Sequence, residues 1–242
     1  FADLRALSDW VSSLGGGFVS TLPLLAAFLD APFDPSPYSP ASRLFWNELF
    51  VDLRSVPGWS DAGGAPECRD GDLVDYQRIA AFKRREMERA LHGSARDADV
   101  QEALRQFRAA HPRVEDYARF RAVCDRRREG WPVWPDRLRE GDIRDGDFAP
   151  EDAEYHVFAQ WQADRQLAEL AASRGNGTAA LYLDMPLGVN PDSYDVWRFR
   201  DLFAEGVSAG APPDPLFTGG QDWGFRPLNP RALRRTGYGS LI

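Results

Sequence analysis

Three short apolar runs constrain the fold of this chain more than any other feature of its sequence. They occupy residues 18–22, 49–53 and 179–184, and apolar and polar side chains do not alternate along them. Strands covered on both faces of a sheet have such continuous runs, whereas half-exposed strands alternate. A helix or a long crossover precedes each run, which predicts adjacent parallel strands in an α/β fold.

Helical spacing of apolar side chains marks three further segments, residues 3–14, 70–128 and 151–173. Glycine-rich stretches at residues 15–17 and 175–177 would end the first and the last of them. The middle segment has charged outer faces, which predicts a helical insertion to one side of the sheet. The pattern alone leaves two architectures open. One is a doubly wound sheet, and the other is a partial (β/α)8 barrel of the TIM type with about the first three strands.

The barrel interpretation divides the chain into three regions. Residues 1–57 would hold the first barrel αβ units, and residues 58–152 the helical insertion subdomain. Residues 153–242 would hold a barrel helix, the third strand and a long loop region. The chain opens on Phe1 within an amphipathic segment and closes on Ile242 without a natural tail, so we expect it to be a piece of a longer protein.

Composition limits the partners. There are 37 Asp and Glu residues against 29 Lys and Arg, a net charge of −8, and an acidic chain repels the phosphate backbone of nucleic acid. No stretch has the length of a membrane span, and no signal peptide is recognisable. The two cysteines, Cys68 and Cys124, lie far apart, and the three histidines match no zinc pattern. We therefore expect a cytoplasmic protein without a metal, and the sequence leaves its oligomeric state open.

Two loops carry the first candidates for a site. Asp184 stands at the carboxyl end of a predicted core strand, where ligands bind in open sheets and barrels alike. Tyr38 follows the first strand between Pro37 and Pro40, which would hold its ring stiffly against the apolar face of a sugar. The plainer alternatives are an Asp that caps a turn and a Tyr that packs within a proline-rich connector.

The third candidate is the long irregular segment at residues 210–224. It combines the polar side chains of Asp214 and Gln221 with the indole of Trp223, as many sugar-binding sites do, although an ordinary surface loop is the alternative. A nucleotide site is not expected, because the glycines at 15–17 precede a strand instead of following one. A serine or cysteine triad is not expected either, because the three histidines lie in helical surroundings.

Taken together and in this order, the motifs resemble the amylomaltase (4-α-glucanotransferase) family. The matching stretches cover both ends of the chain, whereas residues 58–152 match only as a variable helical insertion. The stretches are residues 14–16, 21–24, 36–38, 47–53, 158–161, 165–166, 184–186, 210–214 and 220–224. The resemblance implies a (β/α)8 barrel that transfers α-1,4-glucan segments between maltooligosaccharides by a retaining double displacement, without metal or organic cofactor.

The resemblance also implies roles for the candidate residues. Tyr38 matches the family's aromatic residue at the subsite beside the cleaved bond, and Asp184 matches the third-strand Asp that helps to hold this subsite. The loop with Asp214, Gln221 and Trp223 matches the one that shapes the glucan channel and excludes water.

The sequence departs from the family in two respects. The family's nucleophile stands in an Arg-x-Asp-His motif, which does not occur here. The resemblance therefore implies that the nucleophile and the acid/base lie beyond Ile242 and that this chain alone is inactive. Residues 187–190 also differ from the more apolar version common in the family. Two rival functions stay open: a non-catalytic carbohydrate-binding protein, and an α-amylase-like glycoside hydrolase.

Overall fold

The computed structural model describes residues 1–61, 73–172 and 179–239. Cys68, the predicted glycine stop at residues 175–177 and residues 62–72 of the predicted insertion lie outside these ranges. The described α-helices are α1 (Ala2–Ser13), α2 (Tyr76–Gly93), α3 (Ala98–Ala110), α4 (Val114–Arg127), α5 (Asp136–Arg139), α6 (Pro150–Ala172), α7 (Tyr194–Arg198) and α8 (Pro230–Arg235). The described strands are β1 (Phe18–Thr21), β2 (Phe28–Leu29), β3 (Phe33–Asp34), β4 (Ala180–Leu183), β5 (Gly210–Ala211) and β6 (Gln221–Asp222). Short 3-10 helices are η1 (Glu48–Phe50), η2 (Leu53–Ser55), η3 (Trp131–Val133) and η4 (Arg200–Leu202).

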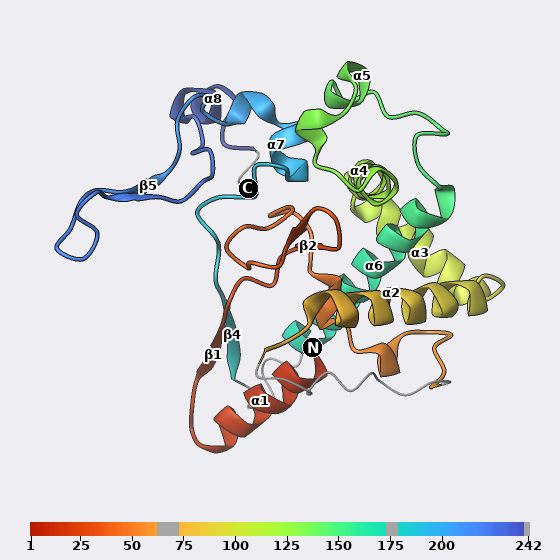
Figure 1. The fold of residues 1–242 in the computed structure, drawn as a ribbon. Helices are drawn as coiled ribbons and strands as arrows, with labels where there is room; N and C mark the ends of the chain where they lie inside the picture. Colours follow the sequence, from red (N-terminus) through yellow and green to blue (C-terminus); the bar gives the residue numbers. More distant parts are fainter. Residues whose placement is uncertain (62–72, 173–178, 240–242) are drawn as a thin grey trace.

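Strands β1 and β4 form a parallel pair, which confirms two of the three predicted strands and their direction. Phe18 is opposite Ala180 and Thr21 is opposite Leu183. Figure 1 shows the two strands side by side, with α1 leading into β1 as its spacing of apolar residues predicts. Both strands run the same way, so the segments that follow them start at one edge of the pair. The other two described pairs, β2–β3 and β5–β6, are short antiparallel hairpins.

The third predicted strand, at residues 49–53, is wrong. The segment consists of η1 and η2 joined through Val51, and side chains from two helices take up its backbone hydrogen bonds. Gln166 of α6 accepts from the Asp52 N–H at 2.8 Å and donates to the Asp52 carbonyl at 3.0 Å. Lys83 of α2 donates to the Val51 carbonyl. A backbone satisfied in this way has no groups left for a neighbouring strand.

The expectation that these strands are covered on both faces is also wrong for the described chain. Val19 is buried, but Phe18 is 65% exposed and Tyr182 is 66% exposed. The rings of these two exposed residues lie 6.3 Å apart on one face of the pair. The reason is that α1 packs against β1, while no described element covers the opposite face.

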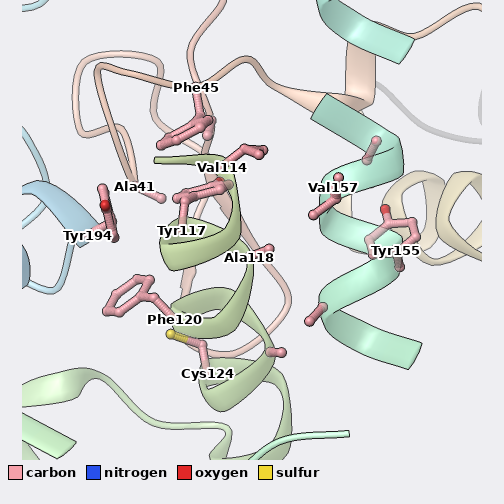
Figure 2. Close-up of a cluster of buried hydrophobic side chains, with 14 of the residues drawn as sticks. Ala41, Phe45, Val114, Tyr117, Ala118, Phe120, Cys124, Tyr155, Val157 and Tyr194 are labelled. Carbon is pink, nitrogen blue, oxygen red and sulfur yellow. The ribbon is translucent and has the colours of Figure 1, made fainter. Parts of the chain in front are cut away.

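The main core is helical. The predicted helices within residues 70–128 are confirmed as α2, α3 and α4, and they form this core together with α6. Figure 1 shows them to one side of the β1–β4 pair, as expected. Helix α4 lies along α6, and Figure 2 shows Ala118 on the side of α4 that faces Val157 of α6. Tyr117 and Phe120 lie on the other side of α4, where their rings contact Tyr194. Phe45, from the loop after β3, stacks on Tyr117 at 3.9 Å between ring centroids.

A charged cluster ties the same helices together at the edge of the core. Arg84 of α2 pairs with Asp125 of α4 at 2.6 Å, and it also pairs with Asp152 of α6. The His156 ring, also on α6, lies 2.9 Å from the same Asp125 carboxylate. One carboxylate therefore joins three helices. Among the described helices, none is long and apolar enough to cross a membrane.

Candidate functional site

The structure brings the two strongest sequence candidates together. The Tyr38 hydroxyl donates a hydrogen bond to Asp184 Oδ2 at 3.2 Å across 146 residues of chain. Asp184 follows β4 directly, and Tyr38 lies in the loop that leads on from β1 by way of the β2–β3 hairpin. Both side chains therefore stand at the carboxyl edge of the parallel pair, as predicted. Partial desolvation and the bond to Asp184 raise the pKa of Tyr38, so its phenol stays protonated as the donor.

A groove of about 520 Å³ opens beside this pair. Tyr38 and Asp184 line one part of it, and Trp223 and Phe225 line another. The Trp223 and Phe225 rings are stacked, with centroids 6.2 Å apart and an angle of 27° between their planes. Trp223 or Phe217 was expected near the rim of a cleft shared by Tyr38 and Asp184, and Trp223 lines the groove whereas Phe217 does not.

The aromatic wall belongs to a hairpin. Residues 210–224 were expected to be irregular, but β5 and β6 pair within them, with Gly210 opposite Asp222. The close pairing needs glycine, because a Cβ on Gly210 would lie 1.9 Å from the Gln221 carbonyl oxygen. Figure 1 shows the β5 hairpin extending away from the helices. The Trp223 indole N–H donates to Gln221 Oε1 at 3.1 Å, so Gln221 orients the ring.

Asp214 does not join the site in this structure. Its Oδ1 accepts from the Leu216 N–H at 2.8 Å and from the Phe217 N–H at 2.6 Å, and its side chain stabilises the turn between β5 and β6. It is exposed and does not line the groove. Of the five predicted residues, Tyr38, Asp184 and Trp223 line the groove, Gln221 supports Trp223, and Asp214 stabilises the hairpin turn.

Sequence reasoning missed three residues that shape the groove. Phe225 stacks on Trp223, and Gly188 leaves room for it, since a Cβ on Gly188 would lie 2.0 Å from the Phe225 ring. Asn190 contacts the Tyr38 loop through hydrogen bonds from its side chain. The departure of residues 187–190 from the apolar family pattern was the one signal that pointed to Gly188 and Asn190.

The groove offers aromatic faces but few groups that could transfer a proton. Asp184 is the one carboxylate among the described residues that line it. A retaining transfer between sugars needs two carboxyl groups, about 5–5.5 Å apart. Aromatic faces and a Tyr–Asp pair suit the apolar face and the hydroxyl groups of a sugar ring. In the part of the chain that is described, no three His, Cys, Asp or Glu residues are grouped so as to hold a metal ion.

An α/β chain with a wall of stacked aromatic rings beside a carboxylate has the side-chain chemistry that carbohydrate-binding sites use. Comparison with known proteins makes this specific, because the model of the 4-alpha-glucanotransferase family matches residues 1–242. The 4-alpha-glucanotransferase of Mycobacterium tuberculosis H37Rv is 33% identical over 98% of this chain and 36% of its own length. That of Thermus thermophilus is 30% identical over 99% of this chain and 50% of its own length. The chain therefore belongs to the 4-alpha-glucanotransferase family, and it spans a third to a half of the length of these relatives.

Solved structures show the same fold. The amylomaltase from Streptococcus agalactiae in complex with acarbose matches with a TM-score of 0.79 and 22% identity, over 98% of this chain and 50% of that one. The amylomaltase from Corynebacterium glutamicum matches with a TM-score of 0.77 and 23% identity, over 98% of this chain and 34% of that one. The described residues therefore have the α/β fold of these enzymes over the shared part.

Proposed function

We propose that this chain supplies one wall of the glucan-binding groove of a 4-α-glucanotransferase, which transfers α-1,4-glucan segments between maltooligosaccharides. The observation that carries the proposal is the hydrogen bond between Tyr38 and Asp184 beside the stacked Trp223 and Phe225 rings. Family membership supports this choice over a protein that binds carbohydrate without catalysis and over an α-amylase-like hydrolase. The acarbose complex of the Streptococcus agalactiae relative supports an oligosaccharide ligand.

The barrel architecture is part of this proposal. We infer that β1 and β4 are neighbouring strands of a (β/α)8 barrel whose other strands belong to the remainder of a longer protein. Support comes from the share of the relatives that the chain spans, 36% in one case and 50% in another. Exposed Phe18, Leu22 and Tyr182 provide the apolar surface that further strands would cover. A groove at the carboxyl edge of the strands is the position at which barrel enzymes bind their substrates.

The groove has a single carboxylate among its described lining residues, and this limits the roles that its residues can have in the reaction. A retaining double displacement uses one carboxylate as nucleophile and a second carboxyl group to protonate the leaving oxygen. Asp184 cannot serve both functions, and its bond to Tyr38 suits it to hold sugar hydroxyl groups. We therefore propose that Tyr38, Asp184 and Trp223 bind and orient the glucan, that Gln221 and Asp214 stabilise the hairpin wall, and that the reacting carboxylates come from elsewhere in the enzyme. The cytoplasmic location and the absence of a cofactor remain predictions.

Calorimetric titration of the 242-residue chain with maltotriose and with acarbose tests the proposal. We expect binding, and we expect Tyr38→Ala and Asp184→Ala each to weaken it by about tenfold. Trp10→Ala is the matched control, because Trp10 is an aromatic side chain that is 60% exposed on α1 and does not line the groove. Equal affinity in all four proteins would refute the assignment of the groove.

Product analysis separates transfer from its rivals. The isolated chain incubated with maltotriose should give neither longer nor shorter oligosaccharides. A longer protein that contains the chain should give maltopentaose and glucose, whereas a hydrolase would give only shorter sugars. Turnover by the isolated chain that survives in Asp184→Ala would contradict the proposed division of roles.

A further inference from the structure

Asn190 uses every polar group it has. Its side-chain Nδ2 donates to Asp34 Oδ2 at 2.9 Å and to Ser39 Oγ at 3.1 Å. Its Oδ1 accepts from the Asp192 N–H at 2.8 Å. Its backbone N–H donates to the Pro40 carbonyl at 3.0 Å. A residue of the loop after β4 is therefore bonded to both ends of the loop that carries Tyr38.

These bonds lead to Tyr38 through a short chain of contacts. Asp34, held by Asn190, accepts from the Ser36 N–H at 3.1 Å through its second oxygen. Ser36 Oγ in turn accepts from the Tyr38 N–H at 3.3 Å, and the Ser36 carbonyl accepts from the Ser39 N–H at 3.1 Å. Prolines at 35, 37 and 40 lack an N–H group, so few backbone hydrogen bonds are available to hold this loop in place.

We propose that Asn190 is a positioning residue that fixes the Tyr38 loop against the loop after β4 and so brings the Tyr38 hydroxyl to Asp184. This rests on the proposed function, since the pair is taken to bind the glucan. Asn190 lies six residues after Asp184 on the same loop. The side-chain bonds of Asn190 therefore set the position of one member of the pair relative to the other. Asn190 is one of the residues at 187–190 in which the sequence departs from the apolar family pattern. A polar side chain at this position makes the hydrogen bonds that hold the Tyr38 loop.

The chemistry of the contact requires an amide on one side and a carboxylate on the other. Asn190 must donate to Asp34 through nitrogen while accepting from Asp192 through oxygen, and only an amide side chain does both. Replacement by Asp would place two carboxylates face to face, which repel each other at neutral pH. Exchanging the amide and the carboxylate between the two positions restores a donor opposite an acceptor, because Asn at 34 would donate to Asp at 190 and still accept from the Ser36 N–H.

The test compares Asn190→Asp with the exchanged protein Asp34→Asn/Asn190→Asp. Hydrogen exchange of the peptide over residues 34–40 measures how firmly the Tyr38 loop is held, because the Ser36, Tyr38 and Ser39 amides all donate hydrogen bonds within this loop. We expect faster exchange there and about tenfold weaker maltotriose binding in Asn190→Asp. We expect both to return toward the wild-type values in the exchanged protein. The control is Asn229→Asp, since Asn229 caps α8 by accepting from the Arg231 N–H and Asp caps a helix equally well.

Combination with Tyr38→Ala distinguishes positioning from a general loss of structure. If Asn190 acts through Tyr38, Asn190→Asp has no further effect on maltotriose affinity once Tyr38 is Ala. Additive losses, or no rescue by the exchange, would overturn the proposal. If the wild-type chain fails to bind maltotriose, the proposed function fails, and the exchange rates alone then decide whether Asn190 holds the loop. Unchanged exchange in Asn190→Asp overturns the positioning role even where binding is found.

Discussion

Gly188→Ala should displace the aromatic wall of the groove. The added Cβ would lie 2.0 Å from Phe225 Cδ2, 2.3 Å from Cε2 and 2.4 Å from Cγ. Carbon atoms in contact stand about 3.5–4.0 Å apart, so the ring must withdraw by roughly 1.5–2 Å. Trp223 is stacked on Phe225 and has to move with it. The backbone of Gly188 does not have a positive φ, so the clash with the ring is the expected cause of any effect.

Overpacking of this kind costs about 1–3 kcal/mol, which corresponds to a fall in melting temperature of roughly 2–12 °C for a chain of this size. Loss of a stacked aromatic contact should also weaken maltotriose binding by about tenfold. Calorimetry and thermal unfolding measure the two effects. Gly219→Ala in the β5–β6 hairpin is the control, because a Cβ there would meet nothing within 4 Å. Wild-type affinity and melting temperature in Gly188→Ala would refute the tight contact between this loop and the hairpin.

Two further predictions concern the helical core. Gln166→Leu removes both hydrogen bonds to the Asp52 backbone and should lower the free energy of unfolding in urea by about 2–4 kcal/mol. The control is Gln101→Leu at an exposed position, which should change stability by less than about 0.5 kcal/mol. Equal effects of the two substitutions would contradict the role of Gln166. Burial alone would raise the pKa of Asp125, but His156 and then Arg84 bring it well below its usual range, so its stabilisation is present above the unfolded pKa of about 4 and is lost as the pH falls. The urea midpoint should therefore fall more steeply from about pH 5 to pH 3 in the wild type than in Asp125→Asn, and parallel curves would contradict this.

Local sequence patterns were sufficient to predict the helices and strands that form where the spacing of their own apolar residues indicates. The spacing of apolar residues gave α1 and α6 nearly to their ends, and the apolar runs gave β1 and β4 with their parallel direction. The pairing of Tyr38 with Asp184 could also be anticipated, because both follow strands and the carboxyl ends of parallel strands meet at one edge. For the helices and strands, one short segment contains the information that decides its own conformation, and the Tyr38–Asp184 pairing follows from the shared direction of two strands.

The rest depended on partners far away in the sequence. Residues 49–53 have the composition of a strand, but Gln166 and Lys83 take up backbone groups that a strand would have used. The helices of residues 70–128 form the main core because α6, which follows them, packs along α4.

The groove was likewise assembled by the tertiary structure. Gly188 and Asn190 become important only because Phe225 and Asp34 are brought beside them by the fold. A glycine or an asparagine in a loop has no pattern of its own that states which distant group it will meet. The sequence by itself therefore determined the local elements and the chemistry of the candidate residues. The contacts that position them were decided by packing between segments more than 30 residues apart, as in the 156 residues between Asn190 and Asp34.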